Sequence, residues 1–198
     1  PSDLSLALGT ASFSPLKNAA AYAVIANGGK KVEPYFINKV VDRKGNIIFE
    51  KEVIKEQIEQ IVDPRVMFIL KDILQEATFR GTGKKIKPLK RPDFSGKTGT
   101  TNDSESTWFT GFNDYLVSTV WVGFDTPKTL GSREYGNTTA LPIWMDYIKA
   151  NLDLVPVNNS SPPNGLVSIK IDKSTGERVK VDSKSSFFEY FLKEKTPN

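Results

Sequence analysis

The segment FSGKTGTTNDSESTWFTGFNDYLVSTVWVGF, residues 94–124, decides the fold of this chain. It contains three runs rich in β-branched, aromatic and small residues, separated by the polar stretches 102–104 and 113–114. Runs of this composition favour strands, and Asn-Asp pairs between them favour turns. The segment therefore predicts three adjacent antiparallel strands.

Helix-start signals precede this segment at two places. Ser14-Pro15 and Asp63-Pro64 each place a capping residue before a proline, which fits the first helical position. The first helix is Ala-rich, stops at Asn27-Gly28-Gly29 and is expected to be buried. The second is expected to run for about four turns to Arg80-Gly81, where the glycine can adopt a left-handed conformation. Its core face is predicted from the apolar spacing of Val66, Ile69, Leu70, Ile73, Leu74 and Ala77.

The remaining elements complete an α+β pattern. Pro142 opens a third predicted helix, and residues 35–52 contain two β-type runs around a loop at 42–46, which predicts a hairpin. Helices on both sides of consecutive strands imply an antiparallel sheet flanked by helices. We assign the large aromatic residues of the strands and the third helix to packing, namely Trp108, Phe109, Trp121, Trp144 and Tyr147. For Trp108 and Phe109, the lining of a binding groove is the alternative.

A linker of composition VNNSSPPNG follows Pro156. We therefore divide the chain into a compact portion, 1–156, and a tail, 157–198. In the tail, LVSIKID and ERVKV are expected to form a small hairpin around 173–176, and FFEYFLKEK an amphipathic or peripheral segment.

Composition excludes several classes of chemistry. The 198 residues include no Cys and no His, which removes thiolate metal sites and the commonest metal ligand and general base. No metal site is expected, and proton transfers in any reaction fall to Lys, Asp, Glu, Tyr or Ser. The net charge of +4 is mild. A basic patch is formed by Lys84, Lys85, Lys87, Lys90 and Arg91. Its preferred interpretation is a solvated loop, with a polyanion contact as the alternative and nucleic-acid binding less favoured.

The strongest chemical signal is Lys97-Thr98-Gly99-Thr100 on the first predicted strand. Thr98 and Thr100 are one strand period apart, so their hydroxyls project on one face and can hold a carboxylate together with the lysine cation. Gly99 lacks a Cβ and lets another group approach the backbone closely.

Lys-Thr-Gly, together with Ser-x-x-Lys and Ser-Asp-Asn, is a signature of penicillin-binding proteins and class A β-lactamases. Nearly the whole chain resembles the transpeptidase domain, in its C-terminal part, of the bifunctional class A penicillin-binding proteins, and the block 97–125 is the most specific part. The β-lactamase resemblance is confined to the three-residue motif. The segments that carry the resemblance are LALGTASFSPLKNAAAYAVIANGGKKVEPYFINKVVDRKGN, FRGTGKK, SGKTGTTND, TWFTGFNDYLVSTVWVGFD and LPIWMDYIK.

The resemblance implies part of a penicillin-binding-protein/serine β-lactamase-like transpeptidase fold and assigns roles to matching positions. Lys97 would supply positive charge beside the nucleophile, and Thr98 and Thr100 would bind the stem peptide or the β-lactam carboxylate. The Thr100 N–H would form one arm of the oxyanion hole. Gly99 would keep the strand edge open. Family members often carry an acidic residue just before the Trp-Phe pair, where this chain has Ser106-Thr107.

The nucleophilic serine is expected outside this chain. Ser14-Pro15-Leu16-Lys17 satisfies Ser-x-x-Lys formally, but the family motif lies well upstream of the corresponding segment, and Ser14 is better explained as a helix cap. No Ser-x-Asn triplet occurs. The first residues look like mid-domain sequence, so we expect a piece of a longer polypeptide with a glycosyltransferase domain and any membrane anchor upstream.

The implied activity is D,D-transpeptidation of peptidoglycan by serine acyl transfer, with β-lactams as inhibitors and without a metal or organic cofactor. Expected partners are peptidoglycan stem peptides, β-lactams and the upstream remainder of the domain, with no nucleic acid and a membrane only through an upstream anchor. The expected location is the periplasm or the extracytoplasmic face of the bacterial inner membrane. A non-catalytic sensor or scaffold, a serine β-lactamase-type hydrolase and a polyanion-binding surface protein remain alternatives.

Overall fold

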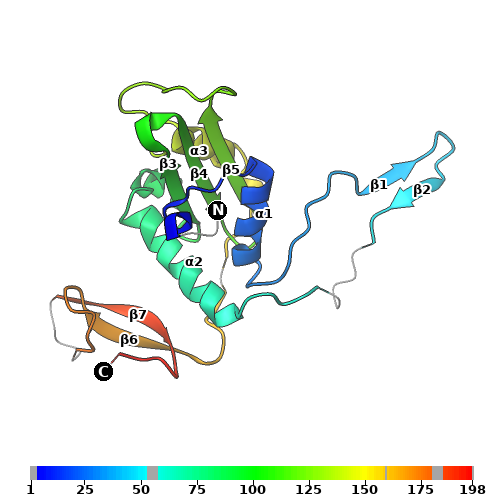
Figure 1. Cartoon of the computed structure of the whole chain (residues 1–198). Helices are drawn as coiled ribbons and strands as arrows, with labels where there is room; N and C mark the ends of the chain where they lie inside the picture. The colour runs from blue at the N-terminus through cyan, green and yellow to red at the C-terminus, as the bar shows by residue number, and fades with distance from the viewer. Residues whose placement is uncertain (1–3, 53–57, 159, 180–184, 198) are drawn as a thin grey trace.

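The chain is described by a computed structural model that covers residues 4–52, 58–158, 160–179 and 185–197. Its centre is an antiparallel sheet of β3 (Ser95–Thr100), β4 (Ser106–Phe112) and β5 (Val117–Gly123) in the order β3-β4-β5. Helices α1 (Pro15–Ala26) and α2 (Pro64–Phe79) lie on one face, and α3 (Ala140–Ala150) lies on the other (Figure 1). The three predicted strands and the α+β class are confirmed.

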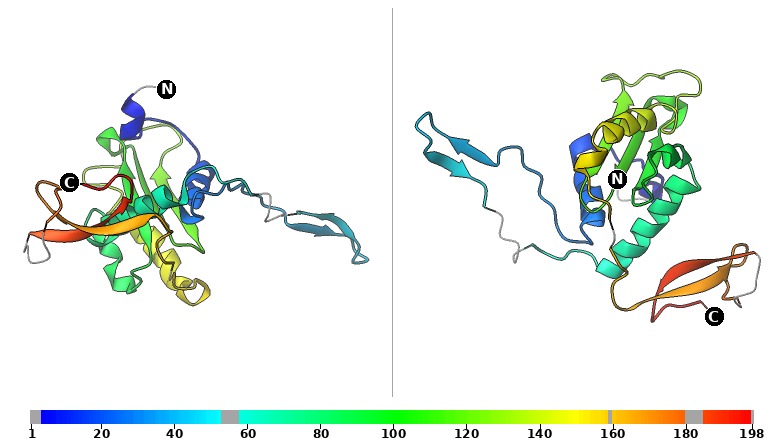
Figure 2. Two further views of the ribbon diagram at one scale, coloured as in Figure 1. Left: turned by 90° about the horizontal axis from the view of Figure 1, so that it is seen from below. Right: turned by 180° about the vertical axis from the view of Figure 1, so that it is seen from behind.

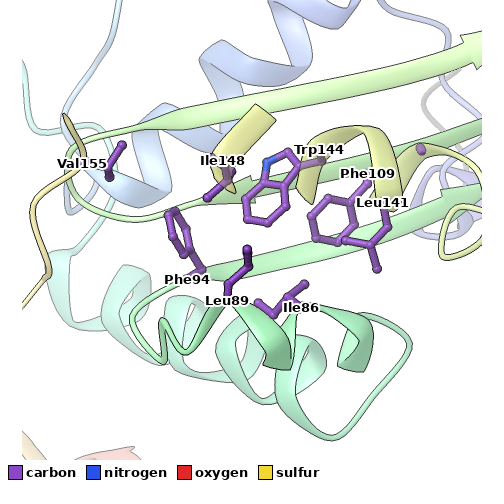
Figure 3. Close-up of a cluster of buried hydrophobic side chains, with 9 residues drawn as sticks. Ile86, Leu89, Phe94, Phe109, Leu141, Trp144, Ile148 and Val155 are labelled. Carbon is purple, nitrogen blue, oxygen red and sulfur yellow. The ribbon is translucent and has the colours of Figure 1, made fainter. Parts of the chain in front are cut away.

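The main core lies between this sheet and α3. The Trp144 ring of α3 is 5.0 Å from the Phe109 ring of β4 and 5.3 Å from that of Phe94, both in edge-to-face geometry (Figure 3). All three side chains are fully buried. Edge-to-face pairs add about 0.5–1.5 kcal/mol each to the effect of burial. Ile86 and Leu89, from the short helix η3 (Lys84–Leu89), pack into the same cluster.

Helix α1 begins where the sequence predicts. The Ser14 hydroxyl accepts the Lys17 N–H at 3.3 Å, and Pro15 occupies the first helical position. The expectation that α1 is buried is wrong, because it contains no fully buried residue. One side packs on β4 and β5, while Leu16 on the other side is 44% exposed.

Helix α2 has the predicted cap and length, but its core face is only partly the predicted one. The Asp63 carboxylate accepts the Arg65 N–H at 2.8 Å. Of the predicted apolar set only Leu74 is buried, and the other buried residues of the helix, Met67 and Thr78, lie outside that set. Val66 and Ile73, both in that set, are exposed. The helix packs on β3 with a mixed apolar and hydroxyl stripe, and its Thr78 hydroxyl donates to the Phe94 carbonyl just before the strand.

Gly81 does not take the left-handed conformation predicted for the end of α2, because it is absent from the positive-φ glycines among the described residues. Its lack of a side chain has another reason. A Cβ at this position would lie 2.8 Å from the Ala77 carbonyl oxygen, so only glycine fits the turn that packs back on the helix.

The basic patch is not the solvated loop we expected. Its lysines are exposed, but the segment forms η3, and Ile86 and Leu89 between them are core residues. Arg91 leaves the patch altogether. Its guanidinium is 10% exposed and donates two hydrogen bonds to the Asp93 carboxylate, at 2.7 and 2.8 Å.

The predicted hairpin at 35–52 is confirmed. Strands β1 (Lys39–Val41) and β2 (Ile47–Glu50) pair antiparallel around the loop 42–46. The hairpin stands away from the central sheet (Figures 1 and 2). All residues of both strands are exposed.

The tail forms a second small sheet. Strand β6 (Leu166–Asp172) pairs along its length with β7 (Ser186–Leu192), so the expected amphipathic or peripheral segment FFEYFLKEK is largely a strand. Within its described residues, the expected partner ERVKV contributes a bridge from Arg178 to Ile171, a Glu177 carbonyl that accepts the Asp172 N–H, and a Val179 N–H that donates to the Lys170 carbonyl. β7 is the longer partner, and its Tyr190 ring packs on Phe68 of α2 at 5.1 Å.

Candidate active-site edge

The outer edge of β3 displays the Lys-Thr-Gly segment. The Thr101 N–H donates to the Ser106 carbonyl at 3.1 Å, so Thr101 and Ser106 form a hydrogen-bonded pair across β3 and β4. Backbone polar groups alternate sides along a strand, so those of Thr98 and Thr100 point away from β4. No other described strand pairs with this edge. The N–H of Thr100 therefore faces the outer side of the sheet, as an oxyanion-hole donor must.

The Lys97 ammonium lies at the same edge. Its Nζ donates to the Thr98 carbonyl oxygen at 2.9 Å. The side chain is exposed, and it takes part in none of the ion pairs found within the described residues. A cation, a backbone carbonyl and a backbone N–H thus line one stretch of strand, with the cation available to an anionic ligand.

The hydroxyls of Thr98 and Thr100 lie on one face of β3, in agreement with the strand period. The Thr100 hydroxyl accepts the Gly136 N–H at 3.0 Å, and a Cβ on Gly136 would lie 3.0 Å from Cβ of Thr98. Both threonines therefore face the loop that holds Gly136. Lys97 and Gly99 occupy the opposite face by strand alternation, and the group that approaches Gly99 is the Trp108 side chain, 3.2 Å from the position of a Cβ.

Two residues near this site lie outside the Lys-Thr-Gly motif. The Thr82 hydroxyl is 2.7 Å from the Thr98 hydroxyl, and Gly136 approaches the strand so closely that a Cβ would lie 2.7 Å from the Gly99 carbonyl oxygen. Thr82 lies in the segment FRGTGKK, which carries part of the resemblance, but the resemblance assigned it no role. Neither residue is within the strand, so only the folded chain brings them to it.

The aromatic residues divide between core and surface. Phe109 and Trp144 are buried as expected, but Trp121 is 37% exposed and Tyr147 is 48% exposed, so their assignment to packing is wrong. Trp108 is half-buried, with its ring 6.2 Å from that of Trp121 and 6.1 Å from that of Phe13. The Lys97 face of the sheet therefore carries an aromatic cluster that is open on one side, because α1 covers only part of that face.

Two hollows lie away from the Lys-Thr-Gly edge. One, of about 490 Å³, is lined by apolar side chains of α2 and β7, with Glu76 and Glu189 also contributing. Burial raises the pKa of Glu189, and the charges on Asp72 and Glu76 raise it further. The other, of about 110 Å³, lies beside Lys71 and Asp93. Neither hollow is lined by a residue of the Lys-Thr-Gly segment.

The other sequence expectations for the site are resolved locally. Ser14 acts as the cap of α1, and its bond to the Lys17 N–H accounts for the formal Ser-x-x-Lys spacing. The described residues contain no group of three or more His, Cys, Asp or Glu side chains arranged to hold a metal ion. In the same part of the chain, no helix has the length and apolar character needed to cross a membrane.

Comparison with known proteins gives the family. The family model described as "Penicillin binding protein transpeptidase domain" matches residues 2–148. Penicillin-binding protein 1A of Pseudomonas aeruginosa is 37% identical over 100% of this chain, which spans 30% of that protein. Penicillin-binding protein 1A of Neisseria gonorrhoeae is 40% identical over 92% of this chain, across 23% of its own length. The chain thus spans less than a third of these curated relatives.

Solved structures agree. The crystal structure of penicillin-binding protein 1A from Haemophilus influenzae has a TM-score of 0.88 and 31% identity, and it covers 100% of this chain and 34% of its own. The PonA1 structure from Mycobacterium tuberculosis has a TM-score of 0.67 and 25% identity, and it covers 82% of this chain and 44% of its own. These matches confirm the transpeptidase fold expected from the resemblance. The chain belongs to the penicillin-binding protein transpeptidase domain family.

Proposed function

We propose that this chain supplies one wall of the active site of a D,D-transpeptidase that cross-links peptidoglycan stem peptides by serine acyl transfer. One observation carries the proposal. The Lys97 ammonium and the Thr100 N–H lie on the unpaired edge of β3, inside the segment that matches the transpeptidase family. A tetrahedral acyl-transfer intermediate needs these two groups, a cation and a fixed backbone donor, beside the reacting carbonyl.

Each group has a defined role in the reaction. The Thr100 N–H donates to the oxygen that becomes negative when the carbonyl carbon turns tetrahedral, and a donor of this kind is worth about 2.7–4 kcal/mol of barrier. Lys97 stabilises anionic groups of the ligand and supplies positive charge beside the nucleophile. The hydroxyls of Thr98 and Thr100 bind the terminal carboxylate of the stem peptide or of a β-lactam.

The reaction proceeds in two acyl transfers. A serine oxygen attacks the carbonyl carbon of the penultimate D-alanine, and the bond to the terminal D-alanine nitrogen breaks as that nitrogen receives a proton. An amine of a neighbouring stem peptide then attacks the acyl-enzyme and releases the serine. The serine belongs to a part of the polypeptide outside this chain, since the one formal Ser-x-x-Lys serine is a helix cap.

The setting follows from the substrate. Peptidoglycan is assembled outside the cytoplasmic membrane, so the domain works at the extracytoplasmic face, held there by an anchor elsewhere in the polypeptide. The relatives named penicillin-binding protein support β-lactams as ligands of the same edge, and the solved structures include PonA1 in complex with penicillin V. The strained lactam carbonyl would take the place of the D-alanine carbonyl.

The proposal is tested with the full-length protein that carries this chain, a fluorescent penicillin and two lysine variants. Lys97→Ala should slow covalent labelling by at least tenfold, while Lys85→Ala, an exposed lysine on η3, should label as the wild type does. Labelling that survives Lys97→Ala would refute the assignment. A wild-type protein that never labels would favour a sensor or scaffold, and rapid release of hydrolysed penicillin would favour a hydrolase.

A further inference from the structure

Three hydroxyl contacts join α2 and the turn after it to the segment 94–98, which includes the start of β3. The Ser95 hydroxyl donates to the Lys71 carbonyl at 2.9 Å, and the Thr78 hydroxyl donates to the Phe94 carbonyl at 3.0 Å. Ser95 and Thr78 are fully buried. The third contact, Thr82 to Thr98 at 2.7 Å, is the exposed one. The first two explain how the strand is held, while the third reaches a side chain of the proposed ligand-binding edge.

The segment between α2 and η3 passes the outer edge of β3 near Thr98. Helix α2 packs on the Lys97 face of the sheet, whereas Ile86 and Leu89 of η3 lie in the core on the α3 face (Figure 3). Thr82 lies between these two elements. Its side chain therefore meets Thr98 on the face that carries the Thr98 hydroxyl.

The backbone around Thr82 is held rigidly by its neighbouring glycines. A Cβ on Gly81 would lie 2.8 Å from the Ala77 carbonyl oxygen, and a Cβ on Gly83 would lie 2.9 Å from Cα of Thr78. The Gly83 N–H also donates to the Ala77 carbonyl at 3.1 Å. The turn is packed against the end of α2 without room for a Cβ at either glycine, so the backbone that carries Thr82 lies close to the helix.

The chemistry of two adjacent hydroxyls gives Thr82 a role. Each hydroxyl has one proton to donate, and the pair shares one hydrogen bond, so only one of the two protons remains for a ligand. If the Thr98 hydroxyl donated to Thr82, its proton would not be available for a hydrogen bond to a ligand carboxylate. If Thr82 donates to Thr98, the Thr98 proton is free, and the hydroxyl becomes a better donor because the two bonds polarise each other.

We propose that Thr82 is a positioning residue for ligand binding: its hydroxyl donates to Oγ1 of Thr98 and so directs the Thr98 proton to the carboxylate of the stem peptide or β-lactam. This inference rests on the proposed function. Thr82 lies outside the Lys-Thr-Gly motif and bonds to Thr98 alone among the hydrogen bonds found within the described residues.

The test measures acylation of the full-length protein by penicillin as a function of its concentration, which separates binding from the bond-forming step. Thr82→Val keeps the shape and removes the hydroxyl, whereas Thr82→Ser keeps the hydroxyl. The valine variant should lose about tenfold in the second-order rate, the loss of one hydrogen bond, mainly through weaker binding. The serine variant should stay close to the wild type.

A second ligand isolates the carboxylate. The methyl ester of the same penicillin lacks the carboxylate that would accept the Thr98 hydrogen bond. Wild type and Thr82→Val should therefore react with the ester at equal rates. Thr175→Val is the matched control, because its exposed hydroxyl accepts the Glu177 N–H at 3.2 Å on the distant β6 turn. Thermal unfolding of each variant shows whether the fold is kept.

Three results would overturn the inference: undiminished acylation of Thr82→Val, an equal loss in Thr82→Ser, or an equal loss with the acid and the ester. The first result would show that the Thr82 hydroxyl does not contribute to ligand binding. The other two would indicate that the substitution disturbs the β3 edge in general. Failure of the proposed function is recognised separately. In that case the wild type itself does not label, or labelling survives Lys97→Ala.

Discussion

Replacing Asp93 with asparagine should be among the most destabilising isosteric changes in the chain, because this carboxylate is the centre of a buried polar network. It accepts two bonds from Arg91, one from the Asn113 amide at 2.9 Å and one from the Asn158 N–H at 3.2 Å. The Arg91 and Asp93 side chains are only 10% and 4% exposed. The network also holds the chain after α3, because Arg91 donates to the carbonyls of Val155 and Pro156.

The magnitude follows from the charge left behind. Asp93→Asn leaves the Arg91 cation buried without an anion and turns an amide NH₂ group towards its N–H donors. Breaking a buried pair in this way costs about 3–5 kcal/mol. For a domain of this size, one kcal/mol moves the melting temperature by about 2–4 °C, so we expect a fall of roughly 6–20 °C.

The assay is a double-mutant cycle with Arg91→Met, followed by Trp fluorescence during urea and thermal unfolding. Met fills most of the space of the arginine stem without its charge, so the double variant should be less destabilised than the sum of the two single variants. A loss below about 1 kcal/mol in Asp93→Asn, or strict additivity of the two changes, would show that the pair is not a coupled buried network.

Further outcomes concern acid, the helix cap and the loop over the site. Burial raises the pKa of Asp93, but the bonds from Arg91, Asn113 and Asn158 outweigh burial and lower it. Its contribution to stability is therefore present above the unfolded pKa of about 3.9 and lost as pH falls through the lower folded pKa. In urea unfolding below that folded pKa, the difference in free energy of unfolding between wild type and Asp93→Asn should therefore become smaller. Ser14→Ala should cost about 1 kcal/mol in urea unfolding yet leave penicillin labelling of the full-length protein unchanged, and lost labelling with an intact fold would make Ser14 a nucleophile candidate again. Gly136→Ala should slow penicillin labelling while the fold remains, because its Cβ would lie 2.5 Å from the Trp108 carbonyl oxygen and push the loop off β3. Unchanged labelling would show that the contact between this loop and β3 is not needed for acylation.

Local signals account for the parts of the fold that the sequence predicted. Ser14 and Asp63 cap their helices with their own side chains, and the prolines that follow fit the first turn. The breaks at 102–104 and 113–114 separate strands that pair with their neighbours in sequence. Such features depend on bonds between residues a few positions apart, so they can be recognised without knowledge of the rest of the molecule.

Errors arose where a distant surface decides the outcome. The apolar spacing of α2 predicted a face that includes Ile73, but Ile73 is exposed, and Thr78 is buried with its hydroxyl against the Phe94 carbonyl just before β3. Likewise, β6 pairs mainly with β7 instead of the nearer ERVKV segment, since the longer strand offers a full ladder and an aromatic contact with α2.

The sequence alone determined that a lysine, two threonines and a glycine lie on a strand, and that the two hydroxyls share a face, because a strand repeats every two residues. Only the tertiary structure decided that this strand lies at the edge of the sheet, with the Thr100 N–H facing outwards. It also brought Thr82, 16 residues from Thr98, and Gly136, 36 residues from Thr100, to the same site. Contacts over such separations are set by how α2, η3 and the loop before α3 pack around the sheet, and no local pattern encodes that packing.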